Sequence, residues 1–156
     1  MKLHIAAVGR PRAEWATAAV EHYRKFLDKY GGAEFHFIPA QRIAEKPGAG
    51  KIPVEETARL IAAVPERSRR VFLDRTGRLF NSQRWAAELE RLRQKSSGPV
   101  AFLVGGPLGL DLTLKRPTDE VWSLSELTFP HEMALVILCE QLARGLSILR
   151  GDDYHN

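Results

Sequence analysis

The chain has 156 residues, of which 44% are hydrophobic and 27% charged, with a net charge of +4. This composition is typical of a globular protein and predicts one domain spanning residues 1–156. The longest apolar segment, residues 133–149, contains Glu140, Gln141 and Arg144, whereas a membrane span needs about 20 nearly uninterrupted apolar residues. We therefore expect a cytoplasmic protein that makes no contact with a membrane.

Cysteine and histidine are used sparingly. The single cysteine, Cys139, lies in an apolar helical run and is interpreted as a small buried hydrophobe. The five histidines are scattered, and no His, Cys and Asp residues show the spacing of metal ligands along the chain. The sequence therefore predicts no metal.

Strand and helix patterns alternate along the chain. Aliphatic, aromatic or β-branched runs that end at turn residues predict five strands, over residues 2–8, 33–38, 69–74, 100–106 and 121–124. Apolar residues at helical spacing, or Pro and Asn at a helix start, predict four helices, over residues 12–30, 53–64, from Asn81 onward and from Pro130 to Leu149. Residues 39–51 show no periodicity and predict a mobile loop.

This order predicts an α/β fold with a largely parallel sheet, in which ligands bind beyond the carboxyl ends of the strands. Two such ends are residues 73–77 and 103–109. The second contains GGPLG, which lacks the Gly-Lys-Ser/Thr ending of a phosphate-binding P-loop and the spacing of a dinucleotide-binding motif. Two interpretations remain: a tight turn that a flat or neutral ligand approaches closely, and a plain turn without a ligand.

The middle of the chain is basic. Residues 59–95 contain ten Lys or Arg and four acidic residues. Such a stretch favours contact with a polyanion such as RNA, but arginines on exposed helix faces are equally consistent with solubility alone. Both interpretations stay open.

The last helix is apolar nearly all round, which indicates burial on more than one side. In a chain of this length we expect the second side to be a subunit interface, where Ala143 and Gly145 would allow close approach. Glu140 and Arg144 lie four residues apart, in the favourable order for an ion pair. They are either a surface pair or, in so apolar a helix, part of a site.

The run SLSELTFPHEMALVILCEQLARGLSI, together with GGPLG before it and Tyr-His near the end, closely resembles the ribosomal large-subunit pseudouridine methyltransferase H family. The resemblance covers the whole chain. These are small SPOUT methyltransferases, so it implies a C-terminal trefoil knot, a rare exception to unknotted topology, and a homodimer. It also implies S-adenosylmethionine as cofactor and methylation of N3 of a pseudouridine in 23S rRNA, with the assembled ribosome as the expected substrate.

The resemblance further assigns roles to individual residues. Residues implied to bind the cofactor are Leu73, Gly105, Gly106, Leu124, Ser125, Glu126, Leu127, Thr128, Phe129 and Pro130. Residues implied to act in catalysis are Glu140, Arg144, Tyr154 and His155. Tyr154 would stack on a base, and His155 would accept a proton or contact the substrate.

The chain departs from the usual family pattern at a few positions, which are Leu108, Leu135, Ala143, Asp153 and Asn156. Several of these fall where RNA is expected. The alternative function is therefore a catalytically silent RNA- or ribosome-binding module that keeps the knotted fold. A nicotinamide oxidoreductase is disfavoured, because the dinucleotide-binding motif is missing.

Overall fold

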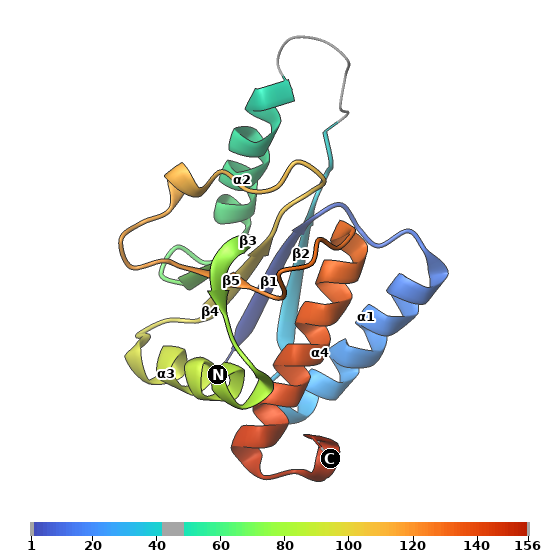
Figure 1. Ribbon diagram of the computed structural model, residues 1–156, viewed down its shortest axis with the longest axis vertical. Coiled ribbons are helices and arrows are strands. Elements are labelled where there is room, and N and C mark those ends of the chain that lie inside the picture. Colours follow the sequence, from blue (N-terminus) through green and yellow to red (C-terminus); the bar gives the residue numbers. More distant parts are fainter. Residues whose placement is uncertain (1, 42–48, 156) are drawn as a thin grey trace.

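The computed structural model describes residues 2–41 and 49–155, and only the backbone of residue 155. Most of the loop expected over residues 39–51 lies outside this part. Five parallel strands form one sheet in the order β2-β1-β4-β3-β5 (Figure 1). The strands are β1 (Leu3–Val8), β2 (Ala33–Ile38), β3 (Arg69–Leu79), β4 (Val100–Val104) and β5 (Glu120–Ser123). The predicted α/β fold with a parallel sheet is confirmed.

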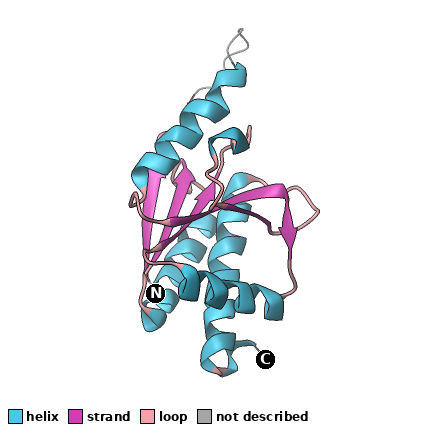
Figure 2. Cartoon of the chain, turned by 90° about the vertical axis from the view of Figure 1, so that its left-hand side faces the viewer, coloured by secondary structure: helices cyan, strands magenta, loops and turns pink. Residues whose placement is uncertain are grey.

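Four α-helices flank the sheet: α1 (Glu14–Leu27), α2 (Ile52–Ala63), α3 (Ser82–Lys95) and α4 (His131–Arg150). Side chains of α1, α3 and α4 pack in one core with alternate strand residues, and side chains of α2 pack in a second core on the other face. Figure 2 shows α2 rising beyond the end of the sheet at which the strands finish, with the C-terminus at the opposite end. We call the end where the strands finish the carboxyl edge.

Local sequence signals explain most element boundaries. All five residues of β4 are buried, as expected for an uncharged central strand. The side chain of Asn81 accepts a hydrogen bond from the Arg84 N–H and caps α3, as predicted. Pro53 lies in the first turn of α2, where its missing N–H is tolerated.

Strand β3 is longer than predicted. The expected strand ends at residue 74, whereas β3 continues to Leu79 after an irregularity in its pairing with β5. Leu73 and Arg78 both lie opposite Trp122, so residues 74–77 bulge out of the ladder. Gly77 permits this, because a Cβ there would lie 2.5 Å from the Trp122 carbonyl carbon. The interpretation of residues 73–77 as a strand end was therefore wrong.

Helix α4 packs between α1 and α3 and over the sheet. Gly145 faces α3: a Cβ there would lie 2.7 Å from Leu89 Cδ1 and 3.0 Å from Trp85 Cδ1. Ala143 is fully buried in the same core. The small side chains at these two positions thus allow α4 to pack closely within its own chain. The expectation that they accommodate a partner subunit was wrong. Neither α4 nor another helix within the described ranges has the length and apolarity of a membrane span.

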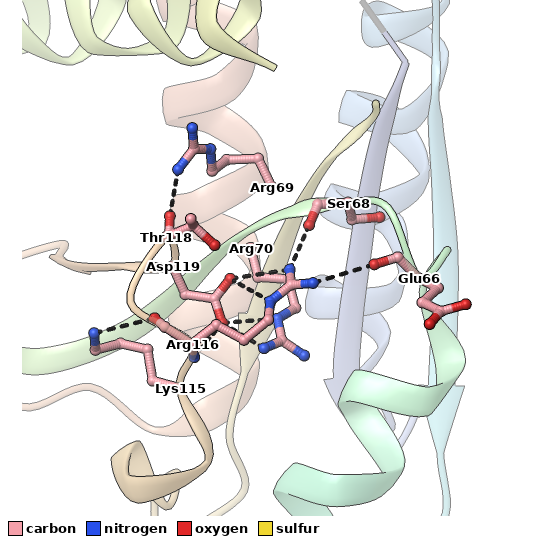
Figure 3. Close-up of polar contacts among 8 residues, drawn as sticks. All are labelled: Glu66, Ser68, Arg69, Arg70, Lys115, Arg116, Thr118 and Asp119. Carbon is pink, nitrogen blue, oxygen red and sulfur yellow. Dashed lines mark hydrogen bonds and ion pairs between the residues drawn. The ribbon is translucent and has the colours of Figure 1, made fainter. Parts of the chain in front are cut away.

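A buried ion pair joins the loop before β5 to the start of β3 (Figure 3). Arg70 donates to Asp119 through Nε at 2.9 Å and through Nη2, and both side chains are almost wholly buried. Arg116 donates to the other carboxylate oxygen of Asp119 at 3.1 Å and to the Ser68 carbonyl at 2.7 Å. Burial would raise the pKa of Asp119, but the hydrogen bonds from Arg70 and Arg116 outweigh it and lower that pKa.

Candidate functional site

The strand order places three of the predicted ligand-binding segments side by side. Leu73 on β3 is in register with Val104 on β4 and with Trp122 on β5. The segments that follow these residues, from Asp74, from Gly105 and from Leu124, therefore begin next to one another at the carboxyl edge. This is the part of a parallel sheet where ligands bind.

The glycine loop after β4 is a tight turn. The Gly109 N–H donates to the Gly106 carbonyl at 2.9 Å, and Gly109 has a φ of +80°, which favours glycine. A Cβ on Gly105 would lie 2.8 Å from the Gly109 carbonyl carbon. A Cβ on Gly106 would lie 3.2 Å from Val8 Cγ1 and 3.3 Å from Glu56 Oε1. The glycines thus let the loop close on itself and pack against β1 and α2.

The segment between β5 and α4 is held by serine hydroxyls. Ser123 Oγ donates to the Ser125 carbonyl at 2.9 Å, and Ser125 Oγ accepts from the Leu127 N–H at 3.0 Å. The side chain of Leu127 is 70% exposed. Of the remaining predicted residues here, Leu124 and Phe129 are half-buried, whereas Glu126, Thr128 and Pro130 are exposed.

A cavity of about 200 Å³ opens at the carboxyl edge beside the glycine loop. Its lining includes Arg10, Glu56, Pro107, Leu108 and His131. None of its lining residues is among the ten predicted to bind the cofactor. The cavity therefore extends the candidate site toward β1 and α2.

Glu56 is the residue of this cavity that sequence reasoning missed. It is only 2% exposed, and its Oε2 accepts a hydrogen bond of 3.3 Å from the Gln41 N–H. A signal was present: Glu56 lies on the same helical stripe as Ile52 and Leu60, at positions i, i+4 and i+8. An acidic residue in a buried stripe is expensive unless it is paired or functional, so the stripe singles it out.

Three of the four predicted catalytic residues lie together on α4 and the tail. Glu140 Oε1 accepts from Arg144 Nε at 2.8 Å and from Arg144 Nη2 at 2.5 Å. The Arg144 guanidinium lies 5.3 Å from the centroid of the Tyr154 ring. Burial, and then a hydrogen bond with Tyr23, raises the pKa of the Tyr154 hydroxyl, so this phenol stays protonated. The side chain of His155 lies outside the described residues.

The tail is tied to its own chain. Gly151 ends α4 with a φ of +76°, and Tyr30 Oη donates to Asp152 Oδ2 at 2.7 Å. Arg144 comes 13 residues after His131, the first residue of α4, which is about 20 Å along a helix. Figure 2 accordingly shows the C-terminus far from the carboxyl edge. The structure therefore groups Glu140, Arg144 and Tyr154 with one another, but not with the cofactor-binding loops of the same chain.

Half of the ten basic residues in the stretch 59–95 form ion pairs. Its paired arginines are Arg70, Arg78, Arg84, Arg91 and Arg93, with partners Asp119, Glu88, Glu90 and Glu120. Arg91 contacts both Glu88 and Glu120, at 2.6 Å each. These pairs favour a structural use for half of the ten basic residues and argue against one continuous RNA-binding face.

Two solved structures share this fold. The crystal structure of a probable methyltransferase from Bordetella pertussis Tohama I matches with a TM-score of 0.52 and 14% identity, covering 92% of this chain and 95% of that one. The crystal structure of a hypothetical protein matches with a TM-score of 0.53 and 13% identity, covering 96% of this chain and 68% of that one. At these identities the likeness concerns the fold alone.

Several curated proteins are more similar to this chain in sequence than these two structures are. The ribosomal RNA large subunit methyltransferase H of Rubrobacter xylanophilus is 42% identical over 97% of this chain and 96% of its own length. Proteins of the same name from Thioalkalivibrio sulfidiphilus and Syntrophobacter fumaroxidans are 37% and 33% identical, each over 99% of both chains. The family described as "Predicted SPOUT methyltransferase" matches residues 1–155. The chain therefore belongs to the SPOUT methyltransferase family, in the group of ribosomal RNA large subunit methyltransferase H.

Proposed function

We propose that this protein, as one domain over residues 1–156, methylates N3 of a pseudouridine in large-subunit rRNA. The observation that carries this proposal is identity of up to 42% with relatives of that name over nearly the full length of both chains. The proposed substrate is the pseudouridine implied by the family resemblance, and the methylated atom is its N3.

S-adenosylmethionine is the proposed methyl donor, and it supplies the electrophilic methyl group when bound. The three adjoining segments that begin after Leu73, Val104 and Ser123 fit such a ligand. Free backbone groups of a glycine turn can hydrogen-bond an adenine, and an exposed apolar side chain such as Leu127 can cover it. The ten predicted residues remain the proposed cofactor contacts, and the register of Leu73 with Val104 and Trp122 supports them.

The charged and aromatic residues of α4 and the tail are proposed to hold the base. Methyl transfer to a ring nitrogen is an in-line displacement, so the base must be aligned and its N3 proton must leave. Glu140 fixes the Arg144 guanidinium with two hydrogen bonds, which leaves Arg144 free to contact the substrate with its remaining donors. Tyr154 offers a neutral ring for stacking, and His155 is the proposed proton acceptor.

A complete site needs a second copy of the chain. Arg144 lies about 20 Å along α4 from its first residue, so its own cofactor loops are out of reach. We propose a homodimer in which the α4 and tail residues of one protomer complete the site of the other. The trefoil knot is part of the same proposal, and the strand order β2-β1-β4-β3-β5 is compatible with it.

The decisive experiment combines calorimetric titration with S-adenosylmethionine and transfer of a labelled methyl group to ribosomes from a methylation-deficient strain. Saturable binding by a dimer, with one methyl group transferred per large subunit, is the expected result. Binding of ribosomes without binding of S-adenosylmethionine would overturn the proposal in favour of the silent RNA-binding module. Light scattering of the same sample measures the dimer directly.

A further inference from the structure

Three potential metal ligands meet at the amino ends of β1 and β2, at the opposite end of the sheet from the carboxyl edge. His4 on β1 is in register with Glu34 on β2, and His36 follows two residues later on the same face. His4 Nδ1 lies 2.9 Å from His36 Nε2 and 4.0 Å from Glu34 Oε2. One ligand atom from each residue lies within 4.8 Å of the other two.

These separations suit a small tetrahedral ion. With zinc–ligand bonds of 2.0–2.1 Å, two ligand atoms of a tetrahedral site lie about 3.3 Å apart. The observed 2.9 Å and 4.0 Å fall on either side of that value. The two imidazole rings are also nearly parallel, with an interplanar angle of 17°, because adjacent parallel strands present them on one face. The 2.9 Å contact is a hydrogen bond between the two rings, so an ion would take the place of the proton that they share.

The surroundings allow an ion to enter. A cavity of about 800 Å³ opens at this end of the sheet, and all three residues line it, together with Lys2 and Arg93. His4 is buried and His36 half-buried, so the strands fix both rings, whereas the exposed Glu34 carboxylate can move onto the ion. The open side of the cavity would leave a fourth position for water.

Two cations, Lys2 and Arg93, line the same cavity. Lys2 Nζ lies 3.1 Å from Glu34 Oε2, but its side chain is 64% exposed and can turn into solvent. Arg93 is already paired with Glu90 at 2.5 Å. The competition from Lys2 therefore weakens the site without blocking it.

We propose that His4, His36 and Glu34 bind a divalent transition-metal ion of the zinc class. Two imidazoles and one carboxylate form a donor set typical of zinc sites with an open position. The spacing of these residues along the sequence predicts no such site, because the ligands come from two separate strands. Only the parallel pairing of β1 with β2 brings the three side chains together. The site is independent of methyl transfer.

The test is calorimetric titration of the untagged, chelator-treated protein with Zn²⁺, repeated with His4→Gln and His36→Gln. We expect one ion per chain, with affinity lowered about tenfold or more in each variant. His22→Gln is the matched control, because His22 is exposed on α1. Lys2→Met should bind Zn²⁺ more tightly, because Glu34 is then free. Binding should also raise the melting temperature of the unmodified chain.

Two outcomes would overturn the proposal. One is the absence of saturable binding by a chain whose circular dichroism shows it to be folded. The other is equal affinity in His4→Gln, His36→Gln and His22→Gln, which would place the ion elsewhere. Co²⁺ absorption provides a second readout, since a tetrahedral site gives strong visible bands that the His4 and His36 variants should lose.

Discussion

The guanidinium of Arg144 contacts two groups, the Glu140 carboxylate on the same helix and the Tyr154 ring in the tail. The ion pair sets the direction of the guanidinium, and the ring contact ties the tail to the same point. A change at Arg144 therefore alters both the charge presented to a substrate and the position of the aromatic ring.

Replacing Arg144 by alanine should lower kcat/KM for ribosome methylation by about a hundredfold, because alignment of the reacting base is lost. Binding of S-adenosylmethionine should stay unchanged, since the loops at the carboxyl edge are untouched. The free energy of unfolding should change by only ~0.5 kcal/mol from the lost pair. Filter-bound methyl transfer and calorimetry measure the two quantities.

Arg24→Ala is the matched control for that experiment. Arg24 also pairs with a glutamate on its own helix, Glu21, at 2.7 Å, but the pair is exposed on α1. Activity should persist in this variant. Equal losses in the two variants would assign Arg144 a structural role only.

Gly105→Ala should weaken S-adenosylmethionine binding. The added Cβ would lie 2.8 Å from the Gly109 carbonyl carbon, and backbone cannot move aside as the end of a side chain can. The turn must therefore open, which displaces the groups proposed to hold the cofactor. We expect at least a tenfold rise in Kd by calorimetry, from a loss of roughly 1.4 kcal/mol.

Gly50→Ala provides the comparison for Gly105→Ala. A Cβ at Gly50 meets no atom of the described residues within 4 Å, so the same chemical change adds no clash with them. Its Kd should equal that of the unmodified chain. If Gly105→Ala also bound normally, the glycine loop would be a plain turn without a role in cofactor binding.

Asp119→Asn should destabilise the chain by about 3–5 kcal/mol, because Arg70 is left buried without its counter-charge. The lowered pKa of Asp119 also gives a pH dependence: the folded state binds this proton less readily than the unfolded state. Its stabilisation is therefore complete above the ordinary aspartate pKa and is lost as the pH falls through the lowered value. The free energy of unfolding, measured with urea at several values between pH 7 and pH 3, should fall less steeply with decreasing pH in the variant than in the unmodified chain.

Cys139 should not react with thiol reagents in the folded protein. Burial raises the pKa of its thiol to about 12, so the reactive thiolate is scarce at neutral pH. Addition of a disulfide reagent at pH 8 should label the chain only after unfolding in urea. Rapid labelling of the folded chain would contradict the burial of α4 between α1 and α3.

The sequence predicted the strands and helices well where the signal was local. Asn81 as a cap and the uncharged run of β4 are examples, since both depend on neighbouring residues only. On α1, the large aromatic residue Trp15 is 51% exposed. The buried residues of α1 are instead Ala16, Val20 and Leu27, because the packing of α1 on α4 decides which stripe is covered.

Features that depend on distant contacts were beyond sequence patterns. Gly145 was expected at a subunit interface but contacts Trp85 and Leu89, which no periodicity within α4 can reveal. The departures from the family pattern at Leu135 and Ala143 are buried in the same core, so in this chain those positions serve packing. The proximity of His4 and His36 likewise required the pairing of β1 with β2.

The position of β1 between β2 and β4 has a consequence for biosynthesis. Leu3, near the start of the chain, pairs with Val100 on β4, and β3 and β5 are added beyond β4. Such distant pairings slow folding, because a long loop must close before they form. The first strand therefore stays unpaired on its β4 side until most of the chain has left the ribosome. The sheet of an enzyme proposed to act on ribosomes would thus be completed only late in its own synthesis on a ribosome.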